Sequence, residues 1–140
     1  MPSLEQIRAT FAADRFATDA AGCEIRLAEP GHAICAMKLQ PHHRNAAGTP
    51  QGGAIFTLAD FAFAVAVNAF AENVTVSLQH DITFLSPAKG SEVLAEAICV
   101  RAGRSTCFYT VTVTADVCAT VANIADNGCR PQENVHDIVC

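Results

Sequence analysis

The feature that most constrains the fold is an apolar run in the middle of the chain. Residues 54–70 read AIFTLADFAFAVAVNAF, with neither Pro nor Gly and with many Ala, the best helix former. They predict one long helix of about 25 Å at 1.5 Å per residue. Because this helix is apolar nearly all round, other elements must cover most of its surface.

A membrane span is the alternative for such a run, since about 20 apolar residues are enough to cross a bilayer. Asp60 near its centre argues against this, because a carboxylate there costs roughly 2.5 to 3.5 kcal/mol on an insertion scale, and no Lys/Arg-rich flank sets an orientation. We therefore expect a buried helix and no membrane partner.

The pattern around this helix has a period of two, which is typical of strands. In residues 74–85, Val76, Leu78, Ile82 and Phe84 share one face and Ser77 lies with the polar residues on the other. Further strands are predicted over 91–102, 105–115 and 117–125, with a tight turn at Ala115–Asp116, and a hairpin over 23–29 and 32–40 precedes the helix.

The ends of the chain differ from this pattern. Residues 3–17 predict a short amphipathic helix with Ser3 as its N-cap, and residues 126–140 predict a polar surface tail. The order of helix, hairpin, long helix and meandering strands predicts an α+β domain over residues 1–140, with an antiparallel sheet wrapped around the long helix.

The composition of the chain limits the kinds of partner that we expect. Hydrophobic residues make up 51% of the 140 residues and charged residues 16%, a surplus of apolar surface that favours self-association. The net charge is −5 and no Lys/Arg run occurs, so nucleic acid is not expected as a partner. Seven cysteines without a C-x-x-C pair offer no zinc spacing, and with no secretory signal they indicate the reducing cytoplasm.

Polar residues of the long helix share one narrow stripe. At about 100° per residue, Thr57, Asp60, Ala64 and Asn68 line up with Gly53 at its start, and we expect this stripe to face something other than the core. We also expect the Asp60 carboxylate to be desolvated, and therefore hydrogen-bonded.

The loop that leads into the helix supplies a second group. Residues 48–53, GTPQGG, deliver the chain to the helix N-terminus, where N–H groups and the helix dipole favour a negatively charged oxygen. Gly53 lacks a Cβ, so a ligand can approach its backbone. With the Gly53 N–H and Asp60 on one face, the N–H can polarise a carbonyl while the carboxylate acts as a base that activates water. A purely structural Asp60, bonded to a nearby loop, would give the same pattern.

Three ordered motifs then carry a resemblance. Residues 45–60 (NAAGTPQGGAIFTLAD), 76–90 (VSLQHDITFLSPAKG) and 100–113 (VRAGRSTCFYTVTV) resemble hotdog-fold acyl-CoA thioesterases of the phenylacetate-pathway type, within the 4-hydroxybenzoyl-CoA thioesterase superfamily. The resemblance covers about residues 20 to 125. It implies a five- or six-stranded hotdog sheet around one helix, a homodimer or homotetramer with sites at the subunit interface, and hydrolysis of an acyl-CoA or aryl-acyl-CoA. No metal is implied, and no cofactor apart from the coenzyme A of the substrate.

The same resemblance implies roles for individual residues. Asp60 would be the general base or nucleophile, the Gly53 N–H would hold the thioester oxygen, and Asn45 would orient the substrate or the water. Ser77 matches a position that helps to place the water in some relatives. Gln51 stands where the family has His; it can hydrogen-bond but cannot titrate near neutral pH, so Asp60 would carry the proton chemistry alone.

Other polar residues are weaker candidates. Lys89, Arg101 and Arg104 lie at predicted turns and are the best candidates for the phosphates of coenzyme A. We expect His42 and His43 at the surface of their loop, and His80 half-buried in its strand.

Two alternatives remain at this point. An acyl-thioester hydratase or dehydratase would pair a carboxylate with a catalytic His, and Gln51 removes the most obvious candidate for that His. A non-catalytic acyl-CoA sensor on the same fold would not need Asp60.

Overall fold

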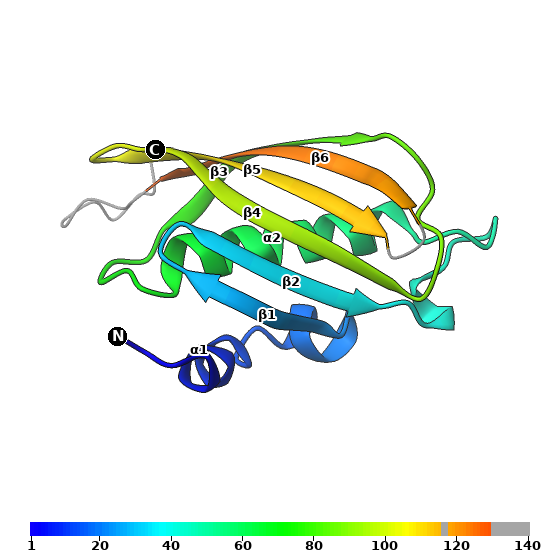
Figure 1. The fold of residues 1–140 in the computed structure, drawn as a ribbon, viewed down its shortest axis with the longest axis horizontal. Helices are drawn as coiled ribbons and strands as arrows, with labels where there is room; N and C mark the ends of the chain where they lie inside the picture. The colour runs from blue at the N-terminus through cyan, green and yellow to red at the C-terminus, as the bar shows by residue number, and fades with distance from the viewer. Residues whose placement is uncertain (116–117, 130–140) are drawn as a thin grey trace.

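The protein is described by a computed structural model that covers residues 1–115 and 118–129. It forms a six-stranded antiparallel sheet that curves around one long helix (Figure 1). The elements are α1 (Leu4–Phe11), a π-helix (Phe16–Ala20), β1 (Cys23–Glu29), β2 (His32–Lys38), a 3-10 helix (Pro41–His43), α2 (Gly52–Asn68), β3 (Val76–Phe84), β4 (Glu92–Ala102), β5 (Thr106–Ala115) and β6 (Cys118–Cys129).

The long helix α2 was predicted within two residues at each end. Gln51 is its N-cap: the backbone there is extended and the side chain accepts a hydrogen bond from the Ala54 N–H at 3.2 Å. The buried side chains of α2, which include Phe61 and Phe63, fill the concave side of the sheet. Burial of this face, rather than any specific polar contact, holds α2 in place.

The N-terminal helix is shorter than predicted. Ser3 caps α1 as expected, in a capping box with Gln6, but α1 ends at Phe11. Asp14 accepts a hydrogen bond from the Ala17 N–H at 3.0 Å and so begins a separate turn, the π-helix. The prediction of one helix over 3–17 is therefore wrong, and Phe16, near its predicted end, is 69% exposed.

The strand order also differs from the predicted meander. The order is β1-β2-β4-β5-β6-β3, so β3 crosses to the far edge and pairs with β6 instead of β4. β6 extends to Cys129, four residues into the predicted tail, because its backbone pairs with β3 on one side and β5 on the other. The rest of that tail, 130–140, and Asp116 of the predicted turn lie outside the described residues.

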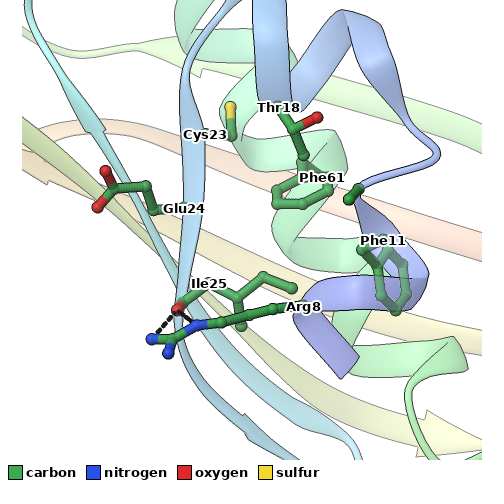
Figure 2. Close-up of a pocket in the computed structure, with 8 residues that line it drawn as sticks. Arg8, Phe11, Thr18, Cys23, Glu24, Ile25 and Phe61 are labelled. Carbon is green, nitrogen blue, oxygen red and sulfur yellow. Dashed lines mark hydrogen bonds between the residues drawn. The ribbon is translucent and has the colours of Figure 1, made fainter. Parts of the chain in front are cut away.

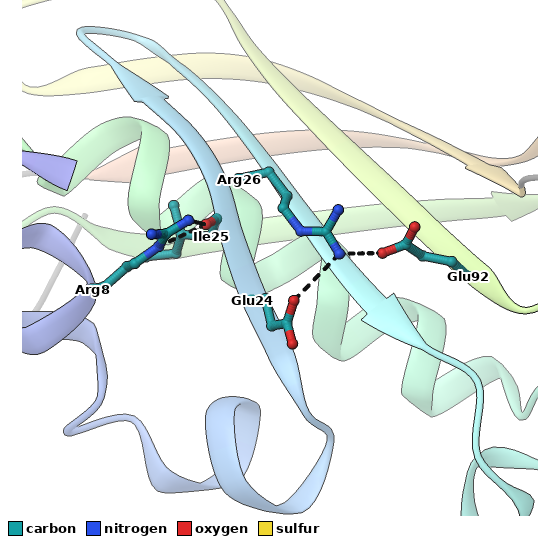
Figure 3. Close-up of polar contacts among 5 residues, drawn as sticks. All are labelled: Arg8, Glu24, Ile25, Arg26 and Glu92. Carbon is teal, nitrogen blue, oxygen red and sulfur yellow. Dashed lines mark hydrogen bonds and ion pairs between the residues drawn. The ribbon is translucent and has the colours of Figure 1, made fainter. Parts of the chain in front are cut away.

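A β-bulge attaches α1 to the sheet. The register of β1 shifts between Ile25 and Leu27, and Arg8 of α1 donates from Nε and Nη2 to the Ile25 carbonyl at 3.0 and 2.8 Å. Figure 3 shows this contact beside Arg26, which pairs with Glu24 at 3.3 Å and with Glu92 of β4. The bulge thus joins the N-terminal helix to one edge of the sheet.

A cavity of about 280 Å³ lies between α1, the π-helix and β1 (Figure 2). Phe11 and Phe61, whose rings meet edge to face at 5.9 Å, line it together with the Cys23 thiol. Burial raises the pKa of that thiol to about 12, with a smaller contribution from Asp14. Cys23 is therefore a neutral, apolar lining residue and no nucleophile at neutral pH.

Candidate active site

The predicted stripe of α2 is its most accessible face. Gly53 and Asp60 are exposed, and Thr57, Ala64 and Asn68 are partly exposed, whereas the residues between them are buried except for Ala54 and Phe56, which are partly exposed. The stripe therefore faces away from the core, as expected. The expectation that Asp60 is desolvated is wrong for the single chain, since 51% of its side chain is exposed.

A second β-bulge brings Ser77 to this stripe. The register of β3 against β6 shifts between Ser77 and Gln79, so Leu78 is an extra residue. Through β6, Ser77 is in register with the buried Cys107, and His80 with the buried Tyr109. Both side chains therefore lie on the inner, helix-facing side of the sheet.

This register overturns the predicted strand pattern. Strict alternation assigned Ser77 to the face opposite Ile82 and Phe84, whereas the extra residue puts all three on the same face. Leu78, predicted on the inner face, is 48% exposed.

Two side chains of β3 contact Asp60. Ser77 Oγ lies 3.4 Å from Asp60 Oδ1, and His80 Nε2 lies 3.5 Å from the same oxygen. The His80 side chain is 7% exposed and packs against two rings of α2: Phe56, stacked at 5.6 Å, and Phe63, edge to face at 5.4 Å. The His80 side chain is more deeply buried than the expected half-burial, and its place beside Asp60 was missed. Alternation alone already assigns His80 to the face of Ile82 and Phe84, and the bulge is what brings Ser77 to the same face.

The helix N-terminus forms the other half of the candidate site. Gly52 and Gly53 are the first two residues of α2, and their N–H groups have no acceptor within the helix. A Cβ on Gly53 would lie 2.7 Å from Gln51 Oε1, so the absence of a side chain is required by the cap itself. Gln51 thus uses its carbonyl oxygen to hold the helix start.

Two cavities flank this N-terminus. One of about 480 Å³ is lined by Gly53 and Thr57 together with His43 and Arg44. The other, of about 370 Å³, is lined by Gly52 and by apolar residues of which Phe84 is the largest. Arg44 is a cation that was not among the predicted site residues, although it directly precedes the first motif.

The loop histidines behave differently from each other. His42 is exposed, as expected, but His43 is buried at 4% exposure, so its assignment to the surface is wrong. Its Nε2 lies 2.7 Å from the Ala21 carbonyl and its Nδ1 accepts from the Gln40 N–H at 2.9 Å. His43 anchors the loop that leads to α2.

Asn45 shapes the same loop from within. Its Oδ1 accepts hydrogen bonds from the N–H groups of Ala47 and Thr49, at 3.0 and 3.2 Å. No contact of its side chain with Asp60 or Ser77 occurs in the described structure, so its role toward a substrate stays a prediction.

The three predicted phosphate-binding cations are not brought together within one chain. Lys89 precedes β4, while Arg101 and Arg104 lie at its other end, in the β4–β5 hairpin (Figure 1). The 11 residues of β4 span about 35 Å at 3.3 Å per residue. Lys89 therefore cannot bind the same phosphate as the two arginines of its own chain.

Comparison with known proteins identifies the family of the chain. The sequence profile described as "Thioesterase superfamily" matches residues 48–122, which is more than half of the chain. The chain belongs to the Thioesterase superfamily. Acyl-coenzyme A thioesterase 13 of Homo sapiens, a curated relative, is 36% identical over 89 residues, which are 62% of this chain and 64% of that protein. The chain thus spans just under two thirds of the length of this superfamily relative.

Solved structures agree with the fold. The E. coli PaaI protein from the phenylacetic acid degradation operon superposes with a TM-score of 0.80 and 26% identity, over 93% of this chain and 97% of that one. A mutant of the phenylacetic acid degradation protein PaaI from Thermus thermophilus gives 0.75 and 30%, over 81% and 97%. The predicted hotdog fold and the resemblance to this branch of the superfamily are thereby confirmed.

Two absences hold for residues 1–115 and 118–129. No helix there has the length and apolar character required to cross a membrane. No group of three or more His, Cys, Asp or Glu side chains there is placed to hold a metal ion.

Proposed function

We propose that the chain hydrolyses acyl-CoA or aryl-acyl-CoA thioesters to the free acid and coenzyme A. The observation that carries this proposal is the position of Asp60. It lies on the most accessible stripe of a mostly buried helix, and Ser77 and His80 both contact its Oδ1. Exposure is ordinary for an acid on a helix surface, whereas the approach of two side chains of β3 to one of its oxygens is not needed to keep it solvated. Membership of the Thioesterase superfamily and the similarity to acyl-coenzyme A thioesterase 13 support the same reaction.

In the proposed mechanism, the thioester carbonyl accepts a hydrogen bond from the Gly53 N–H, which stabilises the negative charge that develops on this oxygen. Asp60 takes a proton from water as the water oxygen bonds to the carbonyl carbon, or attacks that carbon directly to give an anhydride that water then opens. The C–S bond breaks, and the coenzyme A thiolate receives a proton. Asp60 returns to its carboxylate form.

The distance between the two groups points to a second copy of the chain. Gly53 and Asp60 are seven residues apart, about 10 Å along the helix axis, whereas reacting atoms must approach to about 3 to 3.5 Å. The Gly53 N–H of one copy can hold the thioester oxygen while Asp60 of another copy attacks the same carbonyl. Both groups then reach the thioester, although they are far apart within one chain. We therefore propose a homodimer, or a tetramer of two such dimers, with sites at the subunit interface.

The two cavities at the helix N-terminus suggest how the substrate lies. The apolar cavity by Phe84 suits the acyl or phenylacetyl group, and the cavity that contains Arg44 suits the polar coenzyme A portion. Arg44 joins Lys89, Arg101 and Arg104 as a candidate for its phosphates.

The test is thiol release from phenylacetyl-CoA and from a series of acyl-CoAs of increasing chain length. We expect the wild type to release thiol and Asp60→Asn to lose about 10²-fold or more of kcat. The matched control is Asp81→Asn, which changes an exposed acid of the same strand as Ser77. Equal kcat in wild type and Asp60→Asn would refute the mechanism, and a wild type that binds every acyl-CoA without cleaving any would indicate the sensor.

One observation favours a second candidate, the acyl-thioester hydratase or dehydratase. Gln51 removed the most obvious histidine partner for the carboxylate, and the structure places another histidine, His80, at Asp60. Adding an enoyl-CoA to the same series separates the two reactions, because a hydratase consumes the enoyl-CoA without releasing thiol, whereas a sensor consumes none of the substrates.

A further inference from the structure

His80 is a buried titratable side chain that the proposed hydrolysis does not require. It lies between Phe56 and Phe63 with 7% of its side chain exposed. A Phe at this position would pack against the same rings, and an imidazole in such surroundings costs free energy unless its polar atoms have partners. The Nε2 atom faces one acceptor of the candidate site, Asp60 Oδ1, at a distance of 3.5 Å.

Asp60 Oδ1 is contacted from two directions. Ser77 approaches it from one position on β3 and His80 from three residues further along, on the same face because of the bulge. Ser77 Oγ donates to Oδ1 at 3.4 Å, and a second donor on the same oxygen would restrict the rotation of the carboxyl group. Contacts of this kind are often long in unliganded sites and tighten when the substrate binds.

We propose that His80 is a positioning residue for Asp60, and that its Nε2–H holds Oδ1 in the orientation needed for attack on the thioester. The inference rests on the proposed function. His80 supplies an imidazole at the acid, whereas Gln51, at the position where the family has its histidine, is used to cap α2. The role requires an N–H donor at Nε2 and no transfer of a proton by His80.

Two substitutions separate this role from simple packing. His80→Phe keeps a ring between Phe56 and Phe63 but removes the donor. His80→Gln returns an amide N–H close to the position of Nε2. The matched control is His32→Phe, a change of the same type at the β1–β2 turn.

We expect His80→Phe to lower kcat by about tenfold to a hundredfold, the range found when a residue that orients a catalytic group is removed, with little change in KM. His80→Gln should recover most of that loss, and His32→Phe should match the wild type. Wild-type kcat in His80→Phe, or no recovery in His80→Gln, would overturn the inference.

A spectroscopic measurement tests His80 without relying on activity. The protein has five histidines, so ¹⁵N-labelled imidazoles can be resolved by NMR and the His80 signals assigned from His80→Phe. We expect the proton of His80 to reside on Nε2, and its signals to move in Asp60→Asn but not in Asp81→Asn. If the wild type cleaves no thioester, the proposed function fails while this result still decides whether His80 donates to Asp60. Unchanged His80 signals in Asp60→Asn would refute the contact.

Discussion

At the scale of single residues, the candidate site consists of an exposed acid contacted by an exposed serine, Ser77, and by one more deeply buried neighbour, His80. Asp60 is half exposed, whereas His80 is held between aromatic rings of α2. A supporting residue that cannot move restricts the acid at little entropic cost, because its own side chain is already ordered by packing. Preorganisation here comes from hydrophobic packing as much as from hydrogen bonds.

His32 gives a residue-scale prediction about pH. Its Nε2 lies 2.8 Å from Glu96 Oε1 and its Nδ1 lies 3.3 Å from Glu29 Oε2. The hydrogen bond with Glu96, opposed by partial burial and supported by Glu29, raises the pKa of His32 above its ordinary 6.5. A raised pKa in the folded state stabilises the protein fully below pH 6.5, and this stabilisation is lost as pH rises through the folded-state pKa.

We therefore predict that His32→Gln lowers the free energy of unfolding at about pH 5.5 by up to about 1 kcal/mol, and that the loss shrinks at about pH 8.5. Urea denaturation at several pH values measures it. In a Glu96→Gln background most of the pH dependence should disappear. A constant difference between His32→Gln and wild type at all pH values would contradict the assignment.

At the scale of elements, two single-residue bulges determine how α1 contacts β1 and how β3 faces α2. The bulge at Arg26 makes the Ile25 carbonyl available to Arg8, and the bulge at Leu78 rotates Ser77 toward α2. In both cases one extra residue changes which face a strand presents. The N-terminal helix and the candidate site each depend on one of them.

The contact of Arg8 with the Ile25 carbonyl can be tested by mutation. Arg8→Met keeps the aliphatic stem but removes both donors at 3.0 and 2.8 Å. We predict a loss of about 1 to 2 kcal/mol in the free energy of unfolding, from urea denaturation, because a partly buried carbonyl is left without these hydrogen bonds. Arg15→Met is the control, because Arg15 pairs with Asp19 on the surface and its loss should cost no more than about 0.5 kcal/mol. Equal losses in the two variants would show that the donors of Arg8 do not matter.

The elements also show what a sequence can and cannot predict. The run that forms α2 was predictable because its apolar content leaves no other stable arrangement, and Asp60 stood out as its one acid. The inner position of Ser77 was not predictable, because inserting one residue in β3 leaves the apparent alternation of Leu78, Ile82 and Phe84 intact. The predicted strand ended before β6 does, because hydropathy does not report the backbone pairing of β6 with β3 on one side and β5 on the other.

At the scale of the whole molecule, the free edge of the sheet suits the proposed dimer. β3 is an edge strand of nine residues, and Leu78 and Phe84 on it are 48% and 51% exposed. A long edge strand with exposed apolar side chains favours pairing with another chain. Ser77 and His80 belong to this same strand, so a second copy along β3 would lie beside the acid.

Complementation between inactive variants tests whether the site spans two copies. Asp60→Ala lacks the acid, and Gly53→Pro lacks the backbone donor while Pro is tolerated in the first turn of a helix. The Gln51 cap must shift to admit the ring, so circular dichroism should first establish that Gly53→Pro is folded. Each variant alone should be inactive.

After unfolding and refolding together in equal amounts, half of the dimers should contain one chain of each kind. One of their two sites then combines the Gly53 N–H of the Asp60→Ala chain with the Asp60 carboxylate of the Gly53→Pro chain. We predict recovery of about a quarter of wild-type thiol release per chain, the value for random pairing in a twofold dimer. If donor and acid acted within one chain, no mixture could restore activity, because every chain would still lack one of the two groups.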